Sequence, residues 1–217
     1  MIIKAVIFDM DGVLTNTMQF HIISWNYAFN QFDILPSDED LALLEGMSYK
    51  ETIETISKKY HKKLDIEDKD KIYSIKKEKL SEIVQYKTYP EVPELLNFLK
   101  KKNIKLALVS GANKEFVKSI VNKFFKDYFD IIITGNDVKK GKPNPEPYLK
   151  AIKELKFDSE NIIVIENAPL GIQSAIDAGI KTFALTTTLN KRFLKNADKI
   201  FSSHVKLIKF IEKIVEK

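Results

Sequence analysis

Two aspartates follow directly on the first apolar run of the chain. The run Ile2–Phe8 leads into Asp9, and Asp11 lies two residues further on, before a glycine. In open α/β sheets, ligands bind in the crevice beyond the carboxyl ends of the strands. If the run is a strand, Asp9 and Asp11 are the first candidates for chemistry.

Polar residues also follow the later apolar runs. They are Ser110, the pair Thr134 and Gly135, and the pair Glu166 and Asn167. Asp9, Asp11 and Glu166 would repel one another at one sheet edge, and removing three carboxylates from water is costly unless a cation shares the site. A hard, oxygen-ligated ion, most simply Mg²⁺, resolves this conflict.

The same edge also holds groups that suit a phosphate. Ser110 with the backbone amides after it, Asn113 as a helix N-cap, and Lys142 in Gly-Lys-Pro are donors that neutralise an anion. The residues together predict a phosphate site with a metal.

Apolar runs rich in β-branched residues predict the strands that position these groups. The runs are Ile2–Phe8, Leu106–Val109, Ile131–Ile133, Ile162–Ile165, Thr182–Leu185 and, more weakly, Lys199–Phe201. Segments with helical periodicity lie between them. This alternation predicts an α/β fold with a doubly wound, Rossmann-like parallel sheet.

Residues 15–87 break the alternation, because they contain helical patterns and no convincing strand. Ser48 and Glu51 suggest a capping box that opens one helix, and a charged helix is expected from about Ile66 to Gln85. We therefore expect an α/β core made of 1–14 and 88–217, with a small all-helical cap, 15–87, inserted after the first strand.

Composition restricts the class of protein. The 217 residues are 44% hydrophobic and 30% charged, and no run approaches the roughly 18 apolar residues of a membrane span. The chain has no cysteine and no visible export signal, and the lysines behind its net charge of +5 alternate with acids. We expect a cytoplasmic protein, a monomer, with neither nucleic acid nor membrane as partner.

Four segments, in order, resemble the motifs of the haloacid dehalogenase superfamily. They are Asp9–Thr15, Val109–Gly111, Gly141–Pro143 and Val164–Asn167. Their order and spacing cover nearly the whole chain, and the helical insert resembles that superfamily's cap. The most similar subgroup is the β-phosphoglucomutase-like phosphatases and mutases.

The resemblance implies roles for the motif residues. Asp9 would be the nucleophile that forms an aspartyl-phosphate, and Asp11 would protonate the leaving oxygen and then deprotonate the incoming water or alcohol. Ser110, Gly111 and Lys142 would hold the transferring phosphoryl group. Positioning and charge neutralisation of this kind suit a loose phosphoryl transition state.

The implied Mg²⁺ ligands are Asp9, the backbone carbonyl of Asp11, and the pair Glu166 and Asn167. The subgroup usually has Glu-Asp at the last pair, whereas this chain has Glu-Asn. An asparagine can bind through its oxygen but carries no charge. Either the metal affinity is lower, or Glu166 takes the direct role.

In the cap, five residues could face the substrate: His21, Trp25, Glu45, Lys50 and Lys76. Helix packing is the ordinary role for Trp25. A β-phosphoglucomutase uses an arginine in the loop after Gly46 to grip a second phosphate, and this chain has Tyr49-Lys50 there. That difference favours a phosphatase of small phosphomonoesters, sugar phosphates first, over a phosphomutase.

Two other classes stay open until Asp11 is considered. A receiver or other non-catalytic phosphate-binding module needs no second aspartate, and the dehalogenase branch lacks it because its substrate has no alkoxide to protonate. Because Asp11 is present, the sequence predicts an enzyme of phosphoryl transfer.

Overall fold

The computed structural model describes residues 2–216. Within them, six parallel strands form one sheet in the order β3-β2-β1-β4-β5-β6. The strands are β1 (Ala5–Phe8), β2 (Lys105–Val109), β3 (Ile131–Ile133), β4 (Ile162–Glu166), β5 (Lys181–Leu185) and β6 (Lys199–Phe201). The chain moves outward from β1 to one side and then returns to the other. The predicted doubly wound sheet is confirmed, with its switch point at β1.

Strand β1 begins later than predicted, at Ala5 rather than Ile2. Ala5 is paired with Lys105 and with Ile162, which are the first residues of both neighbouring strands. Residues before Ala5 therefore have no continuous ladder to join. The apolar run does contain a strand, but the neighbouring strands β2 and β4 set where it begins.

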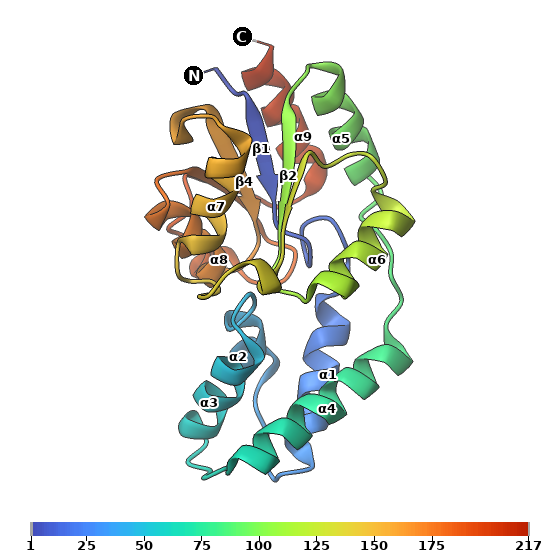
Figure 1. Cartoon of the computed structure of the whole chain (residues 1–217), viewed down its shortest axis with the longest axis vertical. Coiled ribbons are helices and arrows are strands. Elements are labelled where there is room, and N and C mark those ends of the chain that lie inside the picture. The colour runs from blue at the N-terminus through green and yellow to red at the C-terminus, as the bar shows by residue number, and fades with distance from the viewer. Residues whose placement is uncertain (1, 217) are drawn as a thin grey trace.

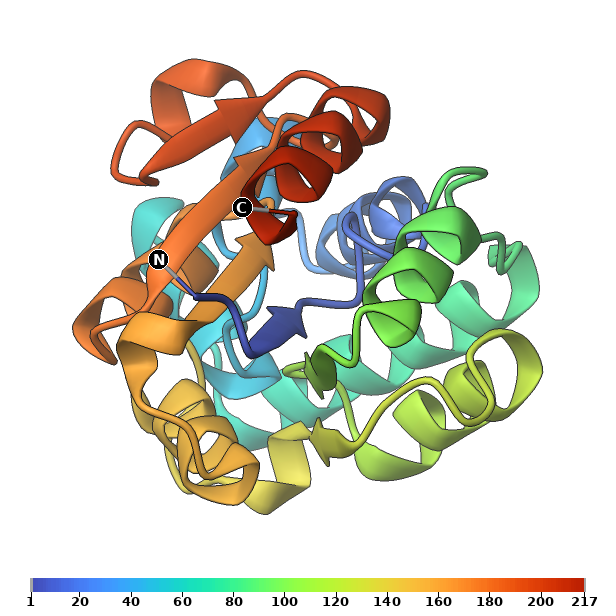
Figure 2. The same ribbon diagram turned by 90° about the horizontal axis from the view of Figure 1, so that it is seen from above.

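Helices cover both faces of the sheet (Figure 2). Val6 and Phe8 pack in one cluster with α5 (Val92–Lys101), α6 (Lys114–Phe124) and α9 (His204–Val215). Ala5 and Ile7 pack in another with α7 (Glu146–Leu155) and α8 (Pro169–Asp177). Successive side chains of a strand point to opposite faces, so one apolar run supplies both halves of the core.

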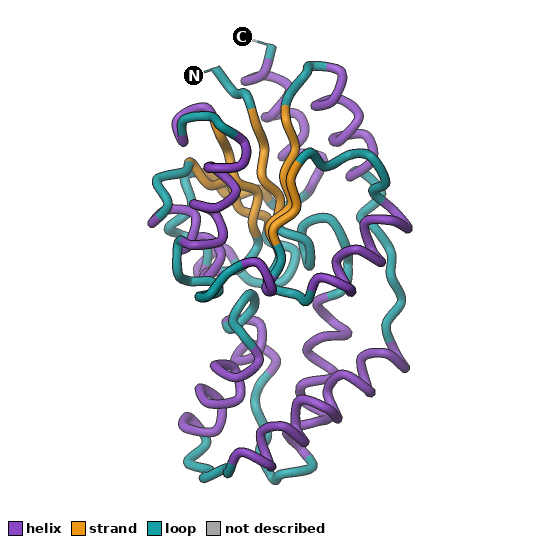
Figure 3. The backbone as a smooth tube through the Cα atoms, in the orientation of Figure 1, coloured by secondary structure: helices purple, strands orange, loops and turns teal. Residues whose placement is uncertain are grey.

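Four helices lie beyond the carboxyl ends of the strands, in the lower half of Figure 1, where Figure 3 shows only helices and loops. They are α1 (Met18–Asn30), α2 (Asp38–Leu43), α3 (Tyr49–Lys59) and α4 (Ile66–Ile83). They enclose a separate apolar cluster that includes Phe29, Ile53 and Ile72. Short 3₁₀ turns at Gly135–Asp137, Ser159–Asn161 and Lys191–Phe193 complete the elements of the described residues.

Two local predictions in these helices need correction. Helix α4 ends at Ile83 rather than Gln85, with Val84 already extended. Ser48 caps α3 by accepting from Glu51 N–H at 3.3 Å, but the Glu51 carboxylate accepts from the Ser48 hydroxyl at 2.6 Å instead of from its backbone. The predicted capping box is therefore only half formed.

The two segments that join the cap helices to the sheet run side by side. Thr15 forms an antiparallel bridge with Thr88, and Asn16 N–H donates to Lys87 O at 3.0 Å. Helices α1 to α4 all fall within 15–87. The division of the chain into a core and a cap domain at these bounds stays a prediction.

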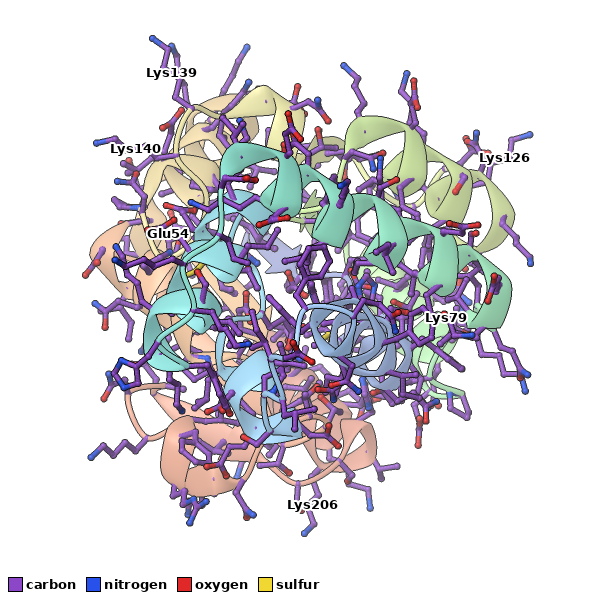
Figure 4. All side chains as sticks on the ribbon, turned by 90° about the horizontal axis from the view of Figure 1, so that it is seen from below. Glu54, Lys79, Lys126, Lys139, Lys140 and Lys206 are labelled. Atoms are coloured by element: carbon purple, nitrogen blue, oxygen red, sulfur yellow. The ribbon has the colours of Figure 1, made fainter. Side chains whose placement is uncertain are left out.

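Basic side chains are spread over the surface. In Figure 4 the labelled lysines 126, 139, 140 and 206 project outward on different sides of the molecule. This distribution agrees with a solvated, lysine-rich surface rather than one basic groove. No helix within residues 2–216 combines the length and the apolar character needed to cross a bilayer.

Candidate active site

Asp9 lies at the carboxyl end of the central strand. Phe8 is paired with Leu108 on one side and Ile165 on the other, and Asp9 N–H donates to Ile165 O at 3.0 Å. The next residues of β2 and β4 therefore reach the same edge. Gly12 turns the chain there with φ +83°, and a Cβ at this position would lie 2.1 Å from Asn167 Nδ2. Only glycine fits so close to the β4 end.

Lys142 is the centre of the site. Its Nζ lies 2.6 Å from Asp9 Oδ1 and 2.6 Å from Glu166 Oε1, and its side chain is only 2% exposed. Burial alone would lower the pKa of Lys142, but the charges of Asp9 and Glu166 outweigh it and raise the pKa well above its usual value. One permanent positive charge is thus held between two acids.

Glu166 has a donor on every side. Oε1 accepts from Lys142 and from Tyr148 OH at 3.0 Å, and Oε2 accepts from the backbone N–H groups of Asn167 at 2.8 Å and Ala168 at 3.1 Å. Gly171 makes room for this carboxylate, since a Cβ there would lie 1.7 Å from Oε1. In this arrangement Glu166 orients Lys142, and little of it is left to bind a metal directly.

Asp9 keeps one oxygen free. Oδ1 accepts from Lys142, whereas Oδ2 has no hydrogen-bond partner among the described residues. Burial raises the pKa of Asp9 to about 8, with Lys142 opposing the shift and Glu166 adding to it. Lys142 alone therefore does not offset the cost of burying the Asp9 carboxylate beside Glu166.

Asn167 is fully buried at the end of β4, and its amide is used asymmetrically. Nδ2 donates to both oxygens of Glu45, at 3.1 and 2.9 Å, and lies 3.0 Å from Thr188 Oγ1. Oδ1 is buried without any partner within residues 2–216. A buried carbonyl oxygen without a donor costs free energy unless something else binds it.

Asn167 Oδ1 bears on whether the residues present could bind the Mg²⁺ that the resemblance implies. Over the described residues, no three or more His, Asp or Glu side chains are grouped to hold a metal. The free oxygens are instead Asn167 Oδ1, Asp9 Oδ2 and the carbonyl of Asp11, which accepts no hydrogen bond in the described chain. Oxygen ligands with one carboxylate and several water positions suit Mg²⁺, so the residues fit the ion.

The carboxylate of Asp11 turns toward the cap helices. It accepts from Thr17 and, at 3.5 Å, from Thr15, and His21 Nε2 lies 3.6 Å away. Burial would raise the pKa of Asp11, but the His21 imidazole and the Thr17 hydroxyl together bring it below the usual value. Asp11 is therefore ionised in this state of the protein.

Three of the five predicted cap residues gather around Asp11. Lys76 Nζ lies 3.2 Å from His21 Nδ1 and 5.3 Å from the Trp25 ring centroid, and burial lowers the pKa of Lys76 to about 8. Trp25 also stacks on Phe29, as expected for helix packing. Lys50, by contrast, is exposed beside Tyr49 and makes no hydrogen bond to this group.

The loop after β2 supplies the remaining predicted groups. Ser110 is buried, and its hydroxyl accepts from Ala112 N–H at 3.2 Å. Asn113 caps α6 through a 2.9 Å bond from Phe116 N–H, as predicted. Gly111 lies under the cap, because a Cβ there would be 3.0 Å from Gly46 O. The cap turn thus covers the predicted phosphate position.

Three side chains that shape the site were not predicted from the sequence. Tyr148 belonged to an apolar helix pattern, but its buried hydroxyl holds Glu166. Thr17 holds Asp11, and Thr188 holds Asn167. A buried tyrosine needs a hydrogen-bond partner, which was a usable signal for Tyr148. The two threonines gave none.

Residues 6–185 match the family model described as haloacid dehalogenase-like hydrolase. A phosphorylated carbohydrates phosphatase of Thermotoga maritima is 32% identical over 86% of this chain and 87% of its own. A beta-phosphoglucomutase of Bacillus subtilis is 32% identical over 82% and 80%. The crystal structure of a beta-phosphoglucomutase from Clostridium difficile superposes with a TM-score of 0.84 at 29% identity, covering 99% and 98% of the two chains. The chain therefore belongs to the haloacid dehalogenase-like hydrolase family.

Proposed function

We propose that this protein is a Mg²⁺-dependent phosphatase that hydrolyses a small phosphomonoester, most simply a sugar phosphate, through an aspartyl-phosphate at Asp9. The family and the names of the two curated relatives support the class of reaction. The observation that carries the proposal concerns the carboxylate of Asp9 at the carboxyl edge of the sheet. Its Oδ1 accepts from Lys142 Nζ, and its Oδ2 has no hydrogen-bond partner among the described residues.

The charge at Asp9 favours a role for a cation. With a pKa of about 8, Asp9 holds its proton at neutral pH, and a protonated carboxyl is a poor nucleophile. A divalent cation bound by Asp9, Asn167 and the Asp11 carbonyl would lower that pKa, so that Asp9 is ionised, and would also neutralise charge on the phosphate. Lys142 would bind a phosphoryl oxygen from the other side.

The first half of the reaction forms the intermediate. One carboxylate oxygen of Asp9 attacks phosphorus while the other stays available to the cation, the bond to the ester oxygen breaks, and that oxygen leaves with a proton from Asp11. Asp11 is ionised in this structure. A phosphate dianion beside it would raise its pKa and supply the proton-carrying form.

The second half restores the enzyme. The Asp11 carboxylate takes a proton from water, the water oxygen attacks phosphorus, and the bond to Asp9 breaks. Inorganic phosphate leaves, and both aspartates regain their starting forms. Ser110 and the amides after it would hold the phosphoryl oxygens throughout.

The relatives' names leave a phosphomutase as the second candidate, and the cap bears on that choice. Tyr49 stacks on Tyr73 at 3.8 Å between centroids, so the position is filled by a ring pair instead of an arginine. The cap, 15–87, contains no arginine. Lysine lacks the planar fork that fixes a second phosphate bidentately, so we favour hydrolysis.

The decisive experiment measures two products in one reaction. Sugar monophosphates are supplied with Mg²⁺, and phosphate release is followed beside conversion of β-glucose 1-phosphate to glucose 6-phosphate with glucose 1,6-bisphosphate present. We expect phosphate release to dominate. Isomerisation faster than phosphate release would assign the mutase, and no turnover of any phosphomonoester would overturn the proposal.

A further inference from the structure

The contact between Glu45 and Asn167 joins the cap to the cation side of the core. Glu45 lies in the turn after α2, and both its carboxylate oxygens accept hydrogen bonds from Asn167 Nδ2. Thr188, in the loop after β5, lies 3.0 Å from the same nitrogen. The donor half of the amide is therefore fully used, by one residue from the cap and one from the core.

The chemistry of an amide makes this contact directional. An aspartate presents two equivalent acceptor oxygens, whereas an asparagine presents one acceptor and one donor group. If the Asn167 side chain turned over, Oδ1 would face both oxygens of the Glu45 carboxylate, and only the Thr188 hydroxyl could donate to it. Binding Nδ2 on the cap side therefore leaves Oδ1 on the other side, where it is buried and has no partner in residues 2–216.

The cap is seated close to this point by other contacts. Ala42 of α2 packs in one apolar cluster with Ile172 and Leu189 of the core. Glu39 of the same helix forms an exposed ion pair with Arg192 at 2.7 Å. Helix α2 and its following turn thus rest on the loop after β5, with Glu45 at the end nearest Asn167.

We propose that Glu45 is a positioning residue for the cation site: it holds the Asn167 amide so that Oδ1 faces the ion. The inference rests on the proposed function, because it takes Asn167 Oδ1 as a ligand of the divalent cation. Glu45 does not bind the ion in this arrangement, since its oxygens are directed at Nδ2.

One consequence follows from the origin of Glu45 in the cap. The ligand is oriented only when the cap turn lies on the core, so cation binding and cap closure favour each other. By thermodynamic linkage, any change that opens the cap lowers the affinity for the cation, and the bound cation in turn stabilises the closed form. An asparagine in place of the aspartate usual in the subgroup thereby makes the site dependent on closure.

The test measures cation affinity directly, without substrate. Mn²⁺ binding is followed by electron paramagnetic resonance, and Mg²⁺ binding by calorimetry, for the wild type, Glu45→Ala and Glu45→Gln. Loss of a residue that orients a ligand typically costs about 10- to 100-fold in metal affinity. We expect that loss for Glu45→Ala. Glu45→Gln should stay within about threefold of wild type, because its amide oxygen still accepts from Nδ2.

Glu39→Ala is the matched control. It removes a carboxylate from α2, the helix before the turn that carries Glu45, and it does not touch Asn167. The ion pair that it breaks is exposed and contributes little to seating the cap. We expect its Mn²⁺ affinity to remain that of wild type. Melting temperatures of all variants, read by circular dichroism, establish that each is folded.

A second pair of variants distinguishes orientation from charge. An aspartate at 167 needs no partner to orient it, so Asn167→Asp should restore Mn²⁺ binding in the Glu45→Ala protein. In the wild-type background the new carboxylate faces Glu45, and the gain should be at least tenfold smaller. Such non-additivity is expected only when two residues act on each other.

The possible results separate cleanly. Wild-type affinity in Glu45→Ala, equal losses in Glu45→Gln and Glu45→Ala, or the same effect of Asn167→Asp in both backgrounds would each overturn the inference. Those results would leave the proposed function standing if the wild type binds Mg²⁺ and releases phosphate. A wild type that binds neither cation would overturn the inference and the Mg²⁺ dependence together.

Discussion

Two clusters of acidic residues lie at the carboxyl edge of the sheet, one around Glu166 and one around Asp11. They differ in how far their hydrogen bonds and charges are satisfied. Around Glu166, each oxygen meets two donors and the lysine between the acids stays charged. Around Asp11, His21 Nε2 is buried without a hydrogen bond among the described residues, and Lys76 is buried with its pKa lowered to about 8. The hydrogen bonds of Glu166 are therefore complete without a ligand, whereas those of the group around Asp11 are not.

The difference follows from the elements that carry each group. Glu166 ends β4, and Asp9 and Asn167 directly follow β1 and β4, whose register is fixed over several residues. His21 and Lys76 come from α1 and α4, which meet Asp11 only where the cap rests on the core. The sheet therefore fixes the positions of the first group, whereas the second group depends on how α1 and α4 pack against the core.

The strongest expected effect tests the strand side of the comparison. Asp9→Asn is isosteric but removes the nucleophile, and the loss of phosphatase turnover should be on the order of 10⁴-fold or more. The measurement is phosphate release with Mg²⁺, beside a melting curve that should stay near wild type. Asp70→Asn, at an exposed position of α4, is the control. A slow but metal-dependent turnover within a hundredfold of wild type would exclude Asp9 as nucleophile.

The next effect concerns stability of the balanced group. Lys142→Met leaves two buried acids without their cation, and breaking a buried pair costs about 3–5 kcal/mol. The pKa of Asp9 should then rise further, so the native state binds more protons than the unfolded state and the variant loses stability as pH increases. Because the pKa of Asp9 in the wild type is already about 8, the two proteins diverge mainly above that pH, and urea unfolding at pH 6 and pH 9.5 measures the difference.

Lys140→Met provides the comparison for that variant. Lys140 is exposed and points outward in Figure 4, so its replacement should change the unfolding free energy by less than about 0.5 kcal/mol. Equal destabilisation of Lys142→Met at both pH values would contradict the charge argument.

A smaller effect is expected at Tyr148. Tyr148→Phe removes one of the two donors to Glu166 Oε1 but leaves Lys142 in place, so the cost should be about 0.5–1.5 kcal/mol. The control is Tyr128→Phe, whose exposed hydroxyl contacts Asn97 at 2.9 Å. If both variants lose the same unfolding free energy, Tyr148 gives Glu166 no special support.

The smallest effect should appear at Lys76 and should have the opposite sign. Lys76→Met removes a desolvated charge, and we expect stability to be unchanged or to increase by about 1 kcal/mol. The wild type should gain stability as pH rises from about 8 toward the normal lysine pKa of 10.5, because the unfolded state there binds more protons. The variant should lack that rise. A destabilised Lys76→Met would show that the cap group is as balanced as the core group.

The sequence alone determined most of the sheet and the residues at its edge. Buried parallel strands have to be apolar, and the polar residue that ends each run has to lie at the carboxyl edge, so Asp9, Ser110 and Glu166 were found by position. The superfamily resemblance and the fold that it implied are confirmed. Both depend on patterns that are local in the chain.

Only the tertiary structure decided how the side chains share their hydrogen bonds. The sequence left open whether Glu166 or Asn167 would bind the metal. Within residues 2–216, the structure gives Glu166 four donors and leaves Asn167 Oδ1 without one. It also brings Glu45 to Asn167 across 122 positions of the chain. Such pairings have no local signature, because a buried polar atom accepts whichever donor the packing of distant elements brings within about 3 Å.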